Sequence, residues 1–440
     1  MQAGEIIRRK VFFSLDKMNG GKMKRLIEVN KAEIVNGIRP EYEERRLSMI
    51  LDYARIHCAF YRNRMLPDCT LSELPVMNKM AYNQYRDQIL SDEYSDKKES
   101  LFQLNTSGST GVPFTVLADP AKMEHVFANM LAVHGLNGFR MGMKRGEFRV
   151  WIPGKNAISK FKSFKNNLLM YDISNMGDAY LDEVCRRLRR ERIQAIIAYS
   201  SALTALTDYI ERKQIDIRKW QVEMIFSMGE AMPKATYEAI ERVFGFPPVR
   251  SYGNNENGFI AVCINGSERY YIDLYNYYIE ILKLDSDEPA EPGELGRIVV
   301  TDYYNRAFPM IRYDTGDTGI MIREEDEAGR LHGYFTTIYG RRASMLYNTK
   351  GEPLSIHVFM NLLLKTEDVV HQVKTIQWEK DRYELLVNAD REKLDEQALV
   401  ESYRNYLGED ARIQVSYVDE IPIQASGKTM VSEQKCKEYL

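Results

Sequence analysis

The order of hydrophobic and polar positions along the chain predicts a helix-covered sheet. Residues 40 to 100 follow a polar, helical pattern. After residue 113, short apolar segments alternate with amphipathic helices, and Leu181, Val184 and Leu188 recur at helical spacing. The strand-like segments of this region are 147–154, 168–174, 195–200, 224–230 and 248–254. Strands and helices in this alternation predict a parallel sheet covered by helices.

The pattern changes twice in the second half of the chain. Residues 270 to 341 contain strand-like segments with turns between them and no convincing helix, which predicts a β-rich subdomain. A helix at 355–365, two strands within 371–390, a helix carrying Leu399, Tyr403 and Tyr406, and a strand at 411–418 follow. We therefore expect an α/β protein with an N-terminal domain of helix-covered sheets at residues 1–341 and a small α+β domain at 342–440.

The composition indicates the class of protein and which partners are expected. The 440 residues include 60 basic and 63 acidic ones, so the net charge is -3. This lacks the excess of positive charge that is typical of nucleic-acid-binding proteins. The five cysteines follow no metal-ligand or disulfide pattern, which indicates a reducing compartment. There is no apolar run long enough to span a membrane and no signal-peptide pattern, so we expect a cytoplasmic protein. A homodimer is expected only as the commonest oligomer.

The N-terminal residues allow two interpretations. Basic residues from Arg8 to Arg25 surround apolar Ile7 and Val11, as in a helix that lies on a membrane surface. Acidic Glu5, Asp16 and Glu28 dilute this charge. We therefore favour a solvated helix packed on the body of the protein.

The segment TSGSTGVP, residues 106–113, consists of small polar residues that cannot build a core. Gly108 and Gly111 can adopt positive φ, so consecutive backbone N–H groups can converge on an anion. The hydroxyl donors are Thr106, Ser107, Ser109 and Thr110. The strand-like FTVLAD that follows favours a turn in a β-hairpin, and a flexible linker is the alternative.

Four other segments carry charged groups beside glycines. SYGNNENG (251–258) contains Glu256, and YDTGDTG (313–319) puts Asp317 in a tight loop, where its two oxygens can accept both hydroxyls of a ribose. YGRR (339–342) ends a strand with Arg341, whose planar guanidinium suits phosphate or ribose oxygens. IPIQASGKTM (421–430) carries Lys428 on a Ser-Gly turn. Taken singly, each residue has a simpler explanation. Glu256 can be a solvated loop acid, and Asp317 can form a turn by bonding its own backbone. Arg341 can belong to a surface ion pair, and Lys428 can be one of many exposed lysines.

Together and in this order, the five segments resemble the adenylate-forming superfamily of acyl-CoA synthetases, peptide-synthetase adenylation domains and luciferases. Within it, the chain looks most like the phenylacetate-CoA ligase group, including its capsule-biosynthesis-type relatives. The resemblance runs from TSGSTGVP to ASGKTM and so covers nearly the whole chain. It implies that the C-terminal domain is mobile and that the ligands are ATP (with AMP as product), Mg²⁺, a carboxylic acid and coenzyme A.

The resemblance also implies roles for individual residues. The β- and γ-phosphates are expected to be bound by Thr106, Ser107, Gly108, Ser109, Thr110 and Gly111. Adenine is expected beside Gly229 and Glu230, with Tyr252 packed on it and Gly253, Asn254 and Asn255 nearby. Asp317 is expected to bind the ribose, and Arg341 the ribose or a phosphate. Glu256 is expected to bind Mg²⁺, and Lys428 to be the catalytic lysine. The acid pocket is expected around Tyr199, Ser200, Met228, Asn254 and Gly258.

The chemistry requires such groups, because a carboxylate that attacks the α-phosphorus brings two anions together. Lys428 can bridge them, and a lysine on a mobile domain can leave before the second half-reaction. Two positions depart from the family. Asn255 stands where the family usually has Thr, and Ala343 stands at the hinge position that is commonly Asp or Lys. Ala343 brings the domain rotation, and hence thioester formation, into question.

The expected function is an ATP- and Mg²⁺-dependent ligase that converts an aryl or arylalkyl carboxylic acid to acyl-AMP and then to acyl-CoA. Two alternatives remain open. The acyl group is passed instead to a carrier-protein thiol or to a sugar amine or hydroxyl, or the chain is a non-catalytic nucleotide-binding scaffold.

Overall fold

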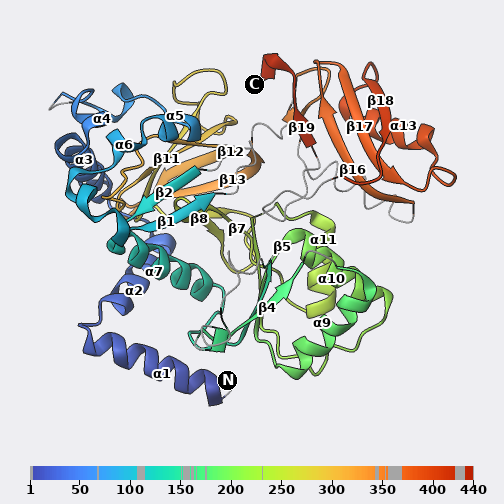
Figure 1. The fold of residues 1–440 in the computed structure, drawn as a ribbon, viewed down its shortest axis with the longest axis horizontal. Coiled ribbons are helices and arrows are strands. Elements are labelled where there is room, and N and C mark those ends of the chain that lie inside the picture. Colours follow the sequence, from blue (N-terminus) through green and yellow to red (C-terminus); the bar gives the residue numbers. More distant parts are fainter. Residues whose placement is uncertain are drawn as a thin grey trace.

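The structure is a computed structural model, and two sheets and a small separate domain make up its architecture (Figure 1). It describes residues 3–66, 69–106, 114–149, 151, 159, 163–164, 166–173, 176–229, 231–341, 346–351, 353–354, 369–421 and 432–439.

Helices dominate the first hundred residues, as the polar helical pattern predicts. They are α1 (Ala3–Met18), α2 (Lys22–Asn36), α3 (Pro40–His57), α4 (Ala59–Arg62), α5 (Lys79–Gln84) and α6 (Arg86–Ile89), with the 3-10 helices η1 (Leu71–Glu73) and η2 (Asp92–Ser100). The helix α7 (Pro120–Leu136) follows and packs on α2. Pro40 and Pro120 each occupy the first turn of their helix, where a missing N–H leaves no bond unmade.

The predicted parallel sheet is confirmed. Its strands are β3 (Arg145–Arg149), β4 (Leu168–Asp172), β5 (Ala195–Tyr199) and β6 (Met224–Met228), in the order β4-β3-β5-β6. The helices between and after them are α9 (Asp178–Arg190), α10 (Ser200–Arg212) and α11 (Lys234–Phe244). Leu188 and Leu206 from these helices pack with Ile196 in one core, whereas Ile197 and Phe226 point into a second core with α2 and α7. Both faces of the sheet are therefore covered, which explains its continuous apolar strands.

The β-rich subdomain is also confirmed, and it begins earlier than predicted. The strands are β7 (Ser251–Asn254), β8 (Gly258–Cys263), β9 (Tyr270–Ile272), β10 (Tyr277–Leu282), β11 (Gly296–Asp302), β12 (Tyr313–Glu325) and β13 (Leu331–Arg341). They form one antiparallel sheet in the order β10-β11-β12-β13-β9-β8-β7. The chain entering β7 runs beside β6, where Ser227 N donates to Val249 O over 2.8 Å. The predicted nucleotide segment 251–258 thus lies where the two sheets meet.

A two-stranded hairpin flanks the hydroxyl-rich segment. β1 (Phe102–Thr106) and β2 (Phe114–Ala118) pair antiparallel from Phe102 opposite Ala118 to Thr106 opposite Phe114. This confirms the predicted hairpin. Residues 107–113, which join the two strands, lie outside the described residues.

The C-terminal part forms its own sheet and core. The elements are β14 (Leu346–Tyr347), β15 (Pro353–Leu354), β16 (Val370–Gln377), β17 (Arg382–Ala389), α13 (Glu396–Leu407), β18 (Arg412–Tyr417), β19 (Ser432–Gln434) and η4 (Lys437–Tyr439). The four-stranded sheet has the order β18-β17-β16-β19, and Leu399 and Tyr403 of α13 lie in its core. Tyr406 of the same helix is exposed, because Leu407 is the next residue on the buried face. The predicted helix at 355–365 lies outside the described residues, and the domain boundary after residue 341 stays a prediction.

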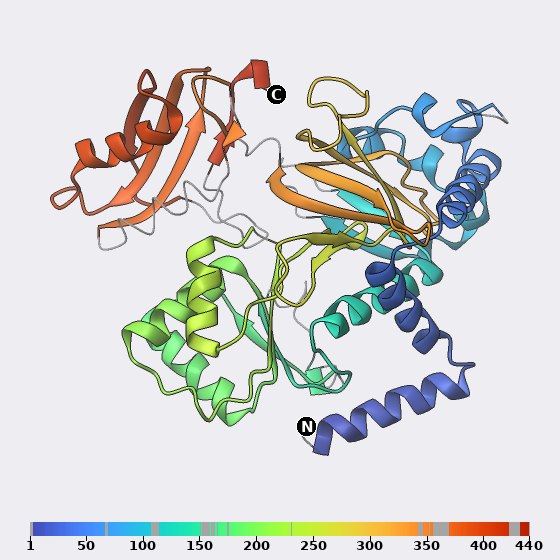
Figure 2. The ribbon, with the colours of Figure 1, turned by 180° about the vertical axis from the view of Figure 1, so that it is seen from behind.

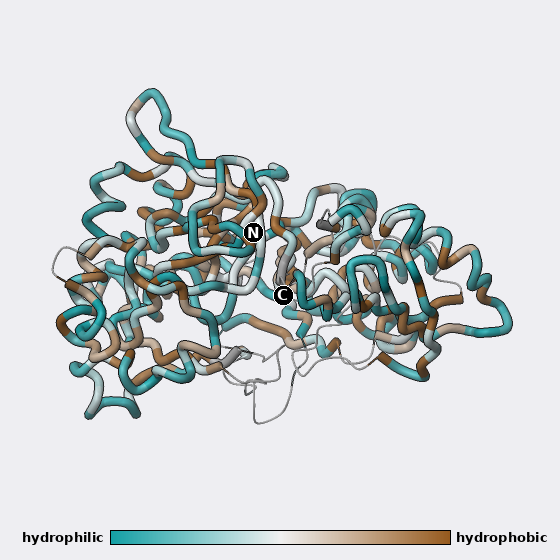
Figure 3. Tube along the Cα trace, turned by 90° about the horizontal axis from the view of Figure 1, so that it is seen from above, coloured by the Kyte–Doolittle hydropathy of each residue, from teal (hydrophilic) through white to brown (hydrophobic). Residues whose placement is uncertain are grey.

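Hydrophobic residues run mainly along the inner strands and helix faces, whereas the outer turns are hydrophilic (Figure 3). Across the described ranges, no helix combines the length and the apolar character that a membrane crossing requires.

Candidate functional site

Strand pairing brings the two predicted ribose residues together. In the β12–β13 hairpin, Asp317 is the register partner of Arg341. On the Asp317 side, Tyr252 of β7 donates its hydroxyl to Asp317 Oδ2 over 2.8 Å. Burial and, second, the Asp317 charge raise the pKa of Tyr252 well above its ordinary value, so the hydroxyl stays a donor. Three residues predicted from separate motifs therefore converge at one end of the antiparallel sheet.

Glu256 lies in the turn between β7 and β8, and its side chain is only 2% exposed. Its Oε1 accepts the hydroxyl of Tyr313 over 2.8 Å and lies 3.0 Å from the Lys79 ammonium. Burial and then the Glu256 charge keep the pKa of Tyr313 well above its ordinary value. The predicted metal ligand is therefore a buried carboxylate with a lysine counter-ion that the sequence motifs did not indicate.

Aromatic packing connects this carboxylate to the hairpin that flanks the hydroxyl-rich segment. Phe114, the first residue of β2, stacks on Tyr313 with ring centroids 6.1 Å apart. Tyr82 of α5 packs edge-on against Tyr313 at 5.6 Å and lies 6.1 Å from Phe114. The same short helix begins with Lys79, after Asn78 caps it by accepting Ala81 N. Phe114, the first described residue after the segment expected to hold phosphate, therefore contacts the same tyrosine that bonds Glu256.

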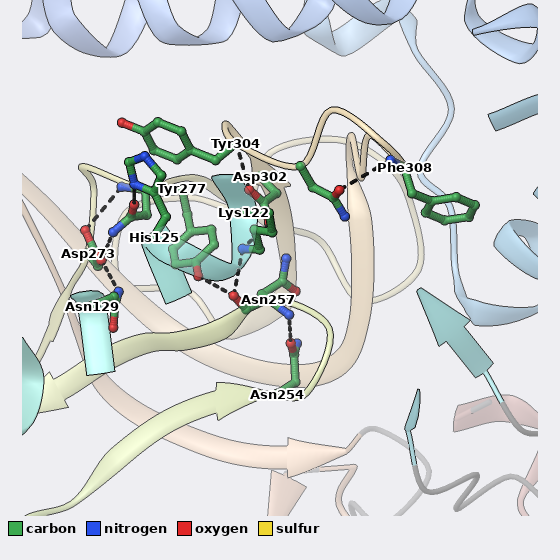
Figure 4. Close-up of polar contacts among 12 residues, drawn as sticks. Lys122, His125, Asn129, Asn254, Asn257, Asp273, Tyr277, Asp302, Tyr304 and Phe308 are labelled. Carbon is green, nitrogen blue, oxygen red and sulfur yellow. Dashed lines mark hydrogen bonds and ion pairs between the residues drawn. The ribbon is translucent and has the colours of Figure 1, made fainter. Parts of the chain in front are cut away.

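A buried polar network supports the turn that carries Glu256 (Figure 4). Lys122 of α7 donates to Asn257 O over 2.8 Å, and Tyr277 of β10 donates to the same oxygen over 2.5 Å. The ammonium of Lys122 also lies 2.5 Å from Asp302 Oδ2, and both side chains are almost fully buried. Asn257 N in turn donates to Asn254 Oδ1 over 2.8 Å. The backbone beside Glu256 is thus fixed from two strands and one helix.

Glycines shape the same turn. A Cβ at Gly253 would lie 2.3 Å from Gly258 O, and Gly258 itself has φ +104. The turn therefore requires glycine at both positions. Between them lies Asn255, one of the residues predicted to lie at the nucleotide.

The residues predicted for the acid pocket and adenine lie at the carboxyl ends of the parallel strands. Tyr199 and Met228 are register partners at the ends of β5 and β6, and Gly229 follows with φ 71. Ligands of open parallel sheets bind at this edge. Ser200 is fully buried, and its hydroxyl bonds Ser227 Oγ over 2.8 Å. The Ser200 hydroxyl is thus hydrogen-bonded to a residue of β6, and its contact with the carboxylic acid substrate stays a prediction.

Several predicted site residues lie outside the described residues: Ser107, Gly108, Ser109, Thr110, Gly111, Glu230, Lys428 and the hinge residue Ala343. Thr106 and Arg341 are described as strand residues only. On either side of Lys428, Ile421 N donates to Gln372 Oε1 of β16, and Ser432 pairs with Thr375 of the same strand. The roles of all these residues remain predictions.

The residues present fit a magnesium ion that arrives with a nucleotide. No cluster of three or more His, Cys, Asp or Glu side chains in the described ranges has the arrangement of a metal site. Magnesium commonly uses one or two carboxylates together with substrate phosphates and water. The single carboxylate of Glu256 suits that arrangement, provided that Lys79 leaves Oε1.

Comparisons with known proteins bear on the fold and on the family resemblance. Residues 346–434 match the family model of the CapK C-terminal domain. Protein CapK of Staphylococcus aureus is 21% identical over 291 residues, which are 63% of this chain and 62% of CapK, so the match spans less than two thirds of CapK. A phenylacetate-coenzyme A ligase of Pseudomonas putida is 24% identical over 73% of this chain and 74% of that enzyme. The crystal structure of a 2-hydroxyisobutyryl-CoA ligase in the postadenylation state, in complex with R3-HIB-AMP, is 16% identical with a TM-score of 0.66, covering 90% of this chain and 89% of that one.

The parallel sheet, the antiparallel sheet and the C-terminal α+β domain together have the architecture of adenylate-forming ligases. The chain is similar to members of that superfamily, the phenylacetate-CoA ligases and CapK, and its residues 346–434 match the CapK C-terminal domain. The family resemblance of the five motifs is thereby confirmed.

Proposed function

We propose that the protein is an AMP-forming ligase that activates an aryl or arylalkyl carboxylic acid and transfers the acyl group to the thiol of coenzyme A. One observation carries the proposal. Asp317, Arg341, Tyr252 and Glu256 come from three motifs distant in the sequence, and strand pairing and hydrogen bonds gather them beside the hairpin of the hydroxyl-rich segment.

In the first half-reaction, an oxygen of the substrate carboxylate forms a bond to the α-phosphorus of ATP. The bond from that phosphorus to the oxygen of the β-phosphate breaks, and pyrophosphate leaves. Asp317 holds the ribose, and Lys428 sits between the carboxylate and the α-phosphate, two anions that repel each other. Magnesium on Glu256 would neutralise charge on the departing pyrophosphate.

In the second half-reaction, the thiol gives up its proton to water, its sulfur forms a bond to the acyl carbon of acyl-AMP, and the bond from that carbon to the phosphate oxygen breaks so that AMP leaves. The thiol needs the space that Lys428 occupies in the first step, so the C-terminal domain has to rotate. The similarity to phenylacetate-coenzyme A ligase supports coenzyme A as the acceptor. The resemblance to capsule-biosynthesis-type relatives leaves a second candidate acceptor open, a carrier-protein thiol or a sugar amine or hydroxyl, and CapK is among the matches.

ATP–pyrophosphate exchange with a panel of carboxylic acids tests the proposal. We expect exchange with at least one aryl or arylalkyl acid, and Lys428→Ala to lower its rate by at least about a hundredfold, the effect of removing one preorganised charge. Exchange without consumption of coenzyme A would favour the other acceptors. Neither exchange nor ATP binding would indicate the non-catalytic scaffold, and an unaffected rate in Lys428→Ala would refute the role of that lysine.

A further inference from the structure

The outer face of α1 is a second apolar surface on a helix that already packs on the protein. Its inner face is anchored by Phe12, whose ring lies 6.4 Å from that of Phe127 of α7. Near its start, the backbone of α1 passes so close to Gly142 that a Cβ there would lie 2.4 Å from Glu5 O. Folding thus uses the inner face only.

Four large apolar side chains form a stripe along the opposite face: Ile7, Val11, Leu15 and Met18. The spacing of four, four and three residues puts them in one line along the helix. Each is more than half exposed, with Val11 at 53%. An exposed line of large apolar side chains on an outer helix is a candidate interaction surface. Figures 1 and 2 both show α1 at the edge of the molecule, where a flat surface can reach it.

Basic side chains border the stripe, and the acids of the helix are turned away from it. Arg8 lies on one side of the stripe and Lys10 and Lys17 on the other, by helix geometry. None of these three forms an ion pair with a described residue. Arg8 lies 5.4 Å from the ring of Phe164, which is itself exposed.

Glu5, Asp16 and Glu28 are the acids that counted against a membrane-surface helix on sequence grounds. Glu28 belongs to α2, where it pairs with Lys24. Glu5 is buried, where it pairs with Arg140 over 2.7 Å and accepts Gln194 over 2.8 Å. Asp16 accepts the backbone N–H groups of Met23 and Lys24 at the start of α2. Neither carboxylate of α1 faces outward with the stripe, and the outer face presents apolar and basic groups together with the uncharged Ser14.

We propose that this face of α1 docks on an anionic lipid surface. The apolar stripe enters the boundary between headgroups and acyl chains while Arg8, Lys10 and Lys17 contact the headgroup charges. A second copy of the chain fits less well, because a twofold contact between two such faces would set like charges against each other. The proposal is independent of the ligase reaction.

Sedimentation of the full chain with vesicles tests the proposal. We expect binding to phosphatidylcholine vesicles that contain about a third phosphatidylglycerol, none to pure phosphatidylcholine, and weaker binding at high salt. The double variant Val11→Glu with Leu15→Glu should bind the anionic vesicles at least about tenfold less. Lys10→Glu with Lys17→Glu should lose even more, since each basic side chain near the surface is worth about fivefold in affinity.

Ile56→Glu on α3 is the matched control, because Ile56 has the same 53% exposure as Val11. It should bind like the wild type. The proposal is overturned if the wild type does not bind anionic vesicles, or if the Val11 and Leu15 double variant binds as the wild type does. It is also overturned if the lipid-free protein is a dimer in analytical ultracentrifugation and this double variant is a monomer, since the stripe then covers a second copy.

Discussion

The ion pair between Lys79 and Glu256 gives the sharpest test of the site geometry. Their charged atoms lie 3.0 Å apart, and the Glu256 side chain is 2% exposed against 20% for Lys79. At an effective dielectric constant of about 20, two unit charges at this distance attract by roughly 5 kcal/mol, and water at the lysine end reduces this. Because Lys79→Met leaves a buried carboxylate without its counter-charge, we expect it to lower the free energy of unfolding by about 3 kcal/mol.

A double-mutant cycle separates the charge pair from other effects of the substitution. Glu256→Gln removes the charge but can still accept the Tyr313 hydroxyl. In that background, Lys79→Met should lower the free energy of unfolding by less than about 1 kcal/mol, measured by urea denaturation near pH 7. Lys97→Met in the exposed helix η2 is the control and should stay within about 0.5 kcal/mol of the wild type.

The same pair connects stability to metal binding. A metal can use Glu256 Oε1 only after Lys79 leaves it. Lys79→Met should therefore bind Mn²⁺ without nucleotide at least about tenfold more tightly than the wild type, and Glu256→Gln should abolish this binding. Unchanged stability in Lys79→Met, or the same loss in both backgrounds of the cycle, would refute the ion pair.

Three further predictions concern the nucleotide site, its support and the core. Asp317→Asn should raise the KM for ATP in pyrophosphate exchange by about tenfold to a hundredfold, whereas Glu324→Gln, an exposed position on the same strand, should leave the KM unchanged. Lys122→Met should lower the free energy of unfolding by about 3–5 kcal/mol in urea denaturation, because it leaves buried Asp302 unpaired, and adding Asp302→Asn should restore part of the loss. Burial lowers the pKa of His134 from 6.5 to about 3. Between these two pH values, His134 is therefore protonated in the unfolded chain but not in the folded protein. Stability should therefore fall as pH falls below 6.5, by about 3 kcal/mol at about pH 4.5, and His134→Phe should remove this component of the pH profile of unfolding.

Local patterns were sufficient to predict most elements. Apolar runs predicted the strands of the parallel sheet, and turn-separated strand segments predicted the antiparallel one. Asp317 and Arg341, which the motifs predict at the ribose or phosphate, are register partners across one hairpin, and their binding roles stay predictions. Such features depend on periodicity and turn chemistry, which a single sequence contains.

The partners of the site residues could not be predicted in this way. Lys79 is one of many lysines in a polar helical stretch, and Lys122 is of a type that is almost never buried unless paired. Their partners Glu256 and Asp302 are far away in the sequence, so only the fold brings them together. The inward turn of Glu5 was missed for the same reason, because its partners Arg140 and Gln194 come from other elements.

The contacts around Glu256 fix the part of the molecule that we propose binds the nucleotide. Lys122 and Tyr277 fix the backbone at Asn257, and Tyr313 fixes the Glu256 carboxylate. Preorganised groups of this kind do not have to be ordered when the substrate arrives. Lys428, by contrast, belongs to the C-terminal part and is expected to act only in the step at the α-phosphate. Loss of Asp317 should therefore appear mainly in the KM for ATP, and loss of Lys428 mainly in kcat, because one group holds the ground state and the other is needed in the transition state.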